Sequence, residues 1–129
     1  MFDHVTLRVS DRAAAEPVYE RLLAVLEIRK TYRGDDYAEW DDFSLGQVTP
    51  DRPATRNLHV GFVAPSREHV DAFWRAGVEA GWRDDGEPGP RTQHGPTYYG
   101  AFLLGPDGNS VEAVHGDRAN AVPAGRVDL

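Results

Sequence analysis

The sequence contains no cysteine, so the chain has neither disulfides nor thiolate metal ligands. It also lacks any apolar run of about 18 residues, the length that a membrane-spanning helix requires. Basic residues are few: 14 lysines and arginines stand against 21 acidic residues, for a formal net charge of −7. Because binding to nucleic-acid phosphates needs a basic surface, this balance disfavours a nucleic-acid-binding protein.

The N-terminal segment lacks the basic residues and the apolar stretch of a secretory signal peptide. Together with the absence of cysteine, this predicts a cytoplasmic protein. The length of 129 residues and the apolar content of 40% are those of one compact domain with a modest core.

Two segments of the chain repeat one pattern, the first beginning at His4 and the second at His59. At the offset between these histidines the segments align without gaps. In each, a short alternating run predicts a strand, and apolar residues at helical spacing then predict a helix. Ser10 or Asp11 is expected to cap the first helix and Ser66 the second.

Short strands are expected after each helix. They are predicted at residues 28–33, 37–40 and 43–48 in the first half, and at 97–104 and 110–115 in the second. Residues 84–96 are rich in proline and glycine and predict a loop. The expected organisation is a single domain, 1–129, with module one at about 1–48, a linker at about 49–56, module two at about 57–116 and a tail at 117–129. The tail is expected to lie over the surface or fray.

Three side chains form a candidate metal site. His4 and His59 lie on the less apolar face of their strands, and Glu112 faces away from Val111 and Ala113, which suit packing against a helix. Imidazole and carboxylate suit Fe, Ni, Zn or Mn, and three protein ligands leave positions open for substrate. The alternatives are hydrogen-bonded strand histidines and a solvent-facing carboxylate.

These residues lie in segments that resemble the vicinal oxygen chelate superfamily, which includes glyoxalase I, extradiol dioxygenases, fosfomycin resistance proteins and bleomycin resistance proteins. The matching segments are DHVTLRVSD, LHVGFVAPSREHVDAFWRAGVEAG and GPDGNSVEAVHG. The resemblance implies an α+β fold of two βαβββ modules that form a half-open eight-stranded barrel. It also implies that His4, His59 and Glu112 are metal ligands. Many small members pair two chains to complete the site, which implies a homodimer.

One position departs from the glyoxalase I pattern, which has a fourth ligand on the last strand of the first module. Aligning FSLGQV with NSVEAV sets Gly46 beside Glu112, unless Glu39, Asp41 or Asp42 substitutes from a shifted register. A glycine there removes one of the two carboxylates that the glyoxalase I proton shuttle uses, so glyoxalase I activity is not expected.

Further candidates come from strand direction and from the resemblance. The run HGPTYYGAF is similar to one in small family members that places a histidine and a tyrosine pair beside the site. This implies proton-transfer roles for His94, Tyr98 and Tyr99, with a loop histidine and aromatic packing as alternatives. Arg8 shares a face with His4 and either binds an anionic substrate group, supports a neighbouring site residue or lies exposed. Trp40 either walls the substrate cavity or belongs to the core.

The resulting hypothesis is a metal-dependent lyase, isomerase or dioxygenase-type enzyme. Its small-molecule substrate would chelate one divalent metal ion through vicinal oxygens. The alternative is a metal-free homodimer that sequesters an aromatic ligand, as bleomycin resistance proteins do, although binding-only members usually lack the three ligands. A third possibility is a degenerate module with a structural or regulatory role.

Overall fold

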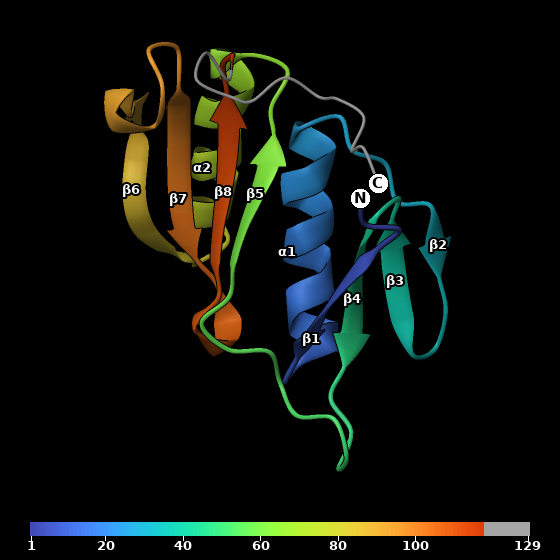
Figure 1. The fold of residues 1–129 in the computed structure, drawn as a ribbon. Helices are drawn as coiled ribbons and strands as arrows, with labels where there is room; N and C mark the ends of the chain where they lie inside the picture. Colours follow the sequence, from blue (N-terminus) through green and yellow to red (C-terminus); the bar gives the residue numbers. More distant parts are fainter. Residues whose placement is uncertain (118–129) are drawn as a thin grey trace, which may run out of the picture.

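The chain folds as two copies of a βαβββ module (Figure 1). The structure, a computed structural model, describes residues 1–117, so residues 118–129 of the predicted tail lie outside the described residues. Module one contains β1 (Val5–Val9), α1 (Arg12–Val25), β2 (Tyr32–Arg33), β3 (Tyr37–Trp40) and β4 (Phe43–Gln47). Module two contains β5 (His59–Val63), α2 (Arg67–Glu79), β6 (Arg83–Pro90), β7 (Tyr99–Leu104) and β8 (Ser110–His115).

Each module forms its own four-stranded sheet, with the orders β1-β4-β3-β2 and β5-β8-β7-β6. The first and last strands of a module pair in parallel, and the other neighbours are antiparallel. A parallel pair requires a crossover, which the helix provides, and the helix then covers one side of the sheet. We call the opposite side of each sheet its open face. The predicted α+β class and the two βαβββ modules are confirmed.

Local sequence explains the boundaries of the helices. The Asp11 side chain accepts a hydrogen bond from the backbone N–H of Ala14 and caps α1. Ser66 caps α2 in the same way, through the N–H of His69. After α2 the chain turns at Gly81, whose φ of 94° is accessible to glycine at little cost. No helix in residues 1–117 is long and apolar enough to span a membrane.

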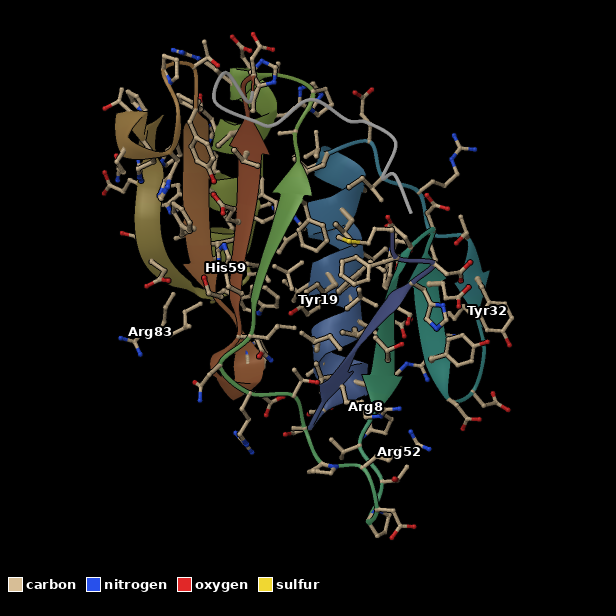
Figure 2. The ribbon with its side chains drawn as sticks, in the orientation of Figure 1. Arg8, Tyr19, Tyr32, Arg52, His59 and Arg83 are labelled. Carbon is tan, nitrogen blue, oxygen red and sulfur yellow. The ribbon has the colours of Figure 1, made fainter. Side chains whose placement is uncertain are left out.

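The two modules pack together through apolar side chains. The ring of Tyr19, on α1, meets Trp82 edge-on at 4.9 Å, and Phe43 meets Phe62 edge-on at 5.2 Å. Figure 2 shows Tyr19 in the centre of the molecule, between the two sheets. Buried Asn109 fixes the linker, because its amide donates to the carbonyl of Thr55 at 2.9 Å. The modules therefore share one core.

Two predicted boundaries were wrong. Most of the predicted loop at residues 84–96 is strand β6, because β7 pairs with it across two register shifts that accommodate its glycines and prolines. Its position at the edge of the sheet also tolerates proline. The strand predicted at 28–33 is shorter and consists of β2 alone. The start of the predicted strand belongs to the end of α1, because the N–H of Ile28 donates to the carbonyl of Leu23.

A buried ion cluster holds α1 to the segment that leads into β2. Glu16 is 6% exposed and accepts hydrogen bonds from Arg12 at 2.8 Å, Lys30 at 3.2 Å and Arg33 at 2.8 Å. Burial by itself raises the pKa of Glu16, but the hydrogen bonds from the three cations outweigh it and lower that pKa to about 2. The carboxylate is thus charged over the whole physiological range.

We expect Glu16→Gln to lower the free energy of unfolding at neutral pH by about 2 to 3 kcal/mol, because Arg12 and Lys30 lose their buried counter-charge. Denaturant unfolding measures this. Glu20→Gln is the matched control, since Glu20 is half exposed and bonds Lys30 alone among residues 1–117, and it should cost no more than about 0.5 kcal/mol.

The same pair of proteins gives a pH test. Because the folded pKa of Glu16 is lowered, its contribution to stability is complete above the unfolded value of 4.5 and is lost as the pH falls towards about 2. The difference between wild type and Glu16→Gln should shrink over this window. A difference in the free energy of unfolding that stays constant down to a pH of about 2 would contradict the lowered pKa of Glu16.

Candidate active site

A chain of hydrogen bonds crosses the open face of module two. The imidazole of His59 meets Ser110 Oγ at 3.1 Å through Nδ1 and Glu112 Oε1 at 2.8 Å through Nε2. The hydroxyl of Tyr98 donates to the other carboxylate oxygen, Glu112 Oε2, at 2.6 Å. The parallel pairing of β5 and β8 explains this arrangement, because it brings residues 53 positions apart onto neighbouring strands.

Two glycines make room for the Glu112 carboxylate. A Cβ at Gly100 would lie 3.1 Å from Glu112 Oε2 and 3.2 Å from Tyr98 Cε1, and one at Gly61 would contact Glu112 at 3.5 Å. Glu112 is consequently 5% exposed, whereas the His59 side chain is 51% exposed. The site is therefore a buried carboxylate with an accessible imidazole above it.

His4 lies in module one, immediately before β1. Its side chain is 58% exposed, and Nδ1 meets Asp3 Oδ1 at 2.8 Å. This hydrogen bond raises the pKa of His4 against the opposing effect of burial, and the charges of Asp3 and Glu39 add to the increase. The fold thus brings His59 together with Glu112 but does not add His4. Nowhere in residues 1–117 do three His, Asp or Glu side chains gather in a group that could hold a metal ion.

The open face of module one contains a cavity of about 530 Å³. Arg8 and Arg52, which Figure 2 shows at the lower end of module one, line it together with Tyr37 and Glu39. His4 lies on its wall. Arg52 and Tyr37 are not among the residues predicted from the sequence, and Glu39 is considered there only as a substitute fourth ligand. The strand alternation signals the last two, because Ala38 and Trp40 between and after them are buried in the core.

The observed register corrects the expected fourth ligand position. The sheets pair Thr6 with Ser44 and Gly61 with Glu112. Thr6 and Gly61 are equivalent in the repeat, so Ser44 is the counterpart of Glu112, and the alignment that placed Gly46 there was wrong by two residues. A shift of two leaves every side chain on the same face, so alternation alone does not detect it.

Serine is not a carboxylate either, so the missing second carboxylate still argues against glyoxalase I activity. The Ser44 hydroxyl bonds Thr6 Oγ1 at 2.6 Å. Of the proposed substitutes, Glu39 pairs with Ser44 across the ladder and lies in the cavity, whereas Asp41 and Asp42 lie in the turn between β3 and β4.

The remaining candidates are placed as follows. Tyr99 points to the helix side of its sheet and donates to Asp71 Oδ1 at 2.7 Å, a hydrogen bond that raises its pKa. His94 is exposed, and its ring lies 5.1 Å from that of Tyr98. Trp40 is 1% exposed and packs against Phe43 in the core, so its ring is not part of the cavity wall.

Comparison with known proteins gives a family match over most of the chain. The model of the Glyoxalase/Bleomycin resistance protein/Dioxygenase superfamily matches residues 1–113. A solved glyoxalase/bleomycin resistance protein from Albidiferax ferrireducens T118 is 33% identical, with a TM-score of 0.77 over 90% of this chain and 99% of that chain.

More distant structures share the fold. The fosfomycin resistance protein FosX from Mesorhizobium loti is 17% identical, with a TM-score of 0.63 over 93% of this chain and 95% of that chain. A glyoxalase/bleomycin resistance protein/dioxygenase family enzyme from Burkholderia phytofirmans PsJN is also 17% identical, with a TM-score of 0.64 over 87% and 95% of the two chains. Among curated proteins, none matches this chain.

Replacing Tyr98 by phenylalanine tests how Glu112 is held. We expect Tyr98→Phe to lower the free energy of unfolding by about 1 to 2 kcal/mol, because the buried oxygen Glu112 Oε2 loses its donor. Tyr99→Phe is the matched control: it removes a hydroxyl bonded to the partly exposed Asp71 and should cost about 0.5 kcal/mol. Equal losses in the two variants, measured by urea unfolding, would contradict this role for Tyr98.

Proposed function

Because this chain belongs to the Glyoxalase/Bleomycin resistance protein/Dioxygenase superfamily, we propose that it is a divalent-metal-dependent enzyme acting on a small molecule through two vicinal oxygens. The observation that carries the proposal is the contact between His59 and Glu112 on the open face of module two. A nitrogen and an oxygen donor meet there at 2.8 Å, with the imidazole open to solvent.

The donor set fits a metal such as Fe, Ni, Zn or Mn. Among residues 1–117, His59 is the only basic side chain paired with Glu112. The other side-chain hydrogen bond to Glu112 comes from the Tyr98 hydroxyl. A buried carboxylate without an arginine or lysine partner can take a metal ion as its counter-charge. His59 and Glu112 would each turn from the other to share it.

The third ligand in this proposal is His4 of a second copy of the chain. Each chain exposes His4 on one open face and His59 with Glu112 on the other, so two chains facing each other would complete two sites. Exposed apolar side chains in both modules support such a homodimer: Phe2, two residues before His4, is 72% exposed, and Val63, at the end of β5, is 77% exposed. The cavity on module one would then become part of the substrate pocket.

The bound metal would act as a Lewis acid that polarises the chelated substrate oxygens. The chain's own residues supply the rest. Tyr98 lies one hydrogen bond from Glu112 and is positioned to hold or move a proton beside the substrate. Arg8 lines the cavity and would bind an anionic substrate group. Tyr99 would influence the site only through Asp71, to which it is hydrogen-bonded. His94 would influence it only through Tyr98, which its ring contacts.

A metal-free binding protein is the second candidate. The cavity of module one favours it, because about 530 Å³ is enough for a small ligand without help from module two. Glyoxalase I activity is not proposed, since Ser44 stands where the second carboxylate would be needed. A cytoplasmic location stays a prediction from the sequence.

Metal content decides between the two candidates. We expect untagged wild-type protein to retain stoichiometric divalent metal by mass spectrometry, and His59→Ala and Glu112→Ala to lose it, because each removes one ligand. His69→Ala is the control, since His69 bonds Ser66 and Glu27 away from the site. Wild-type protein that stays metal-free after incubation with each of the four metals would favour the binding protein.

Mixing variants tests whether two chains share a site. His4→Ala and His59→Ala protomers should each bind no metal, but their heterodimer should bind one ion, because one of its two sites receives an intact His4 and an intact His59. Refolding the two variants together and measuring metal provides the readout. If metal stays absent from the mixture while wild type binds it, the ligands come from a single chain.

A further inference from the structure

The guanidinium of Arg91 is fixed in place by main-chain groups and an aromatic ring. Its terminal nitrogens donate to the carbonyl of Pro90 at 3.2 Å and to the carbonyl of Glu87 at 2.7 Å. Its central carbon lies 5.5 Å from the ring centre of Phe102. Arginine has five N–H groups, so these two hydrogen bonds leave others available.

Strand β6 accommodates this side chain with glycines. A Cβ at Gly89 would lie 3.1 Å from one terminal nitrogen of Arg91, and a Cβ at Gly86 would lie 3.4 Å from the other and 2.9 Å from Phe102. Gly86 also has a φ of 154°, which side chains rarely adopt. A side chain at either position would force the guanidinium to move.

No carboxylate in residues 1–117 lies within ion-pair distance of Arg91. Glu87 contributes its main-chain carbonyl instead. Arg12, by contrast, pairs with the carboxylate of Glu16. A guanidinium that is held rigid and keeps its full charge is prepared to bind an anion, because little side-chain entropy remains to be lost.

Arg91 is also joined to the His59–Glu112 site from two directions. The ring of Phe102 stacks with the imidazole of His59 at 6.0 Å, so one aromatic side chain contacts both groups. The backbone N–H of Arg91 donates to the carbonyl of Tyr98 at 2.9 Å, and Tyr98 holds Glu112.

We infer that Arg91 binds an anionic group of the substrate, a carboxylate or a phosphate-like group, while the vicinal oxygens lie at His59 and Glu112. The substrate class is then an anionic vicinal diol or enol rather than a neutral one. This inference rests on the proposed function for the position of the oxygens. The anion site of Arg91 itself requires no metal.

Catechol and 3,4-dihydroxybenzoate test the inference, because they share the same vicinal oxygens and differ by one carboxylate. We expect metal-loaded wild type to bind the benzoate at least about tenfold more tightly by calorimetry. Arg91→Gln should remove this preference and leave catechol affinity unchanged. Arg83→Gln is the matched control, since exposed Arg83 lies at the far end of β6 (Figure 2) and should keep the preference.

A second measurement needs neither metal nor catechol. Inorganic phosphate should raise the melting temperature of metal-free wild type and of Arg83→Gln, and should raise that of Arg91→Gln much less. Each variant is compared with itself without phosphate, so lower stability of Arg91→Gln does not affect the result. Arg91→Lys keeps the charge without the planar fork and should give an intermediate shift.

The outcomes separate this inference from the proposed function. If neither aromatic ligand binds but phosphate distinguishes Arg91→Gln from Arg83→Gln, the anion site stands and the proposed chemistry fails. If catechol and the benzoate bind wild type equally, and phosphate stabilises all variants alike, the inference is overturned. Arg91 then serves only to hold the main chain of β6 through the carbonyls of Glu87 and Pro90.

Discussion

Parallel pairing between the first and last strand of each module determines whether a carboxylate meets the position opposite it on the open face. In module two it sets Gly61 beside Glu112, which brings His59 within 2.8 Å of the carboxylate. In module one the same pairing sets Thr6 beside Ser44 and leaves that position without a carboxylate. A parallel pair requires a crossover helix, so the helix that covers one side of each sheet also leaves the other side open for chemistry.

Two buried carboxylates in this chain are stabilised in different ways. Three cations surround Glu16, and their hydrogen bonds outweigh burial and lower its pKa to about 2. Glu112, 5% exposed, has a tyrosine hydroxyl and a half-exposed imidazole instead. Glu16 joins α1 to β2 and has no charge left to offer a ligand. Among the described residues no arginine or lysine pairs with Glu112, and this difference is the physical basis for proposing it as the metal ligand.

The distribution of donors between two open faces explains why one chain has only part of the proposed site. His59 and Glu112 lie in module two and His4 lies in module one, with the shared core of Tyr19 and Trp82 between the modules. Because side chains on opposite parts of a packed core do not meet, the proposed third ligand, His4, comes from a second copy of the chain. Arg91 and Phe102 extend the face of module two beyond the metal donors.

The sequence by itself determined the repeated module, the faces of His59 and Glu112 and the helix caps, because alternation, helical spacing and capping are local properties. Only the tertiary structure decided the register that makes Ser44 the counterpart of Glu112, since a shift of two preserves every face. It also decided that residues 83–90 form a strand, through pairing with β7, and that main-chain carbonyls hold Arg91. These features depend on contacts between segments distant in sequence, which no local pattern records.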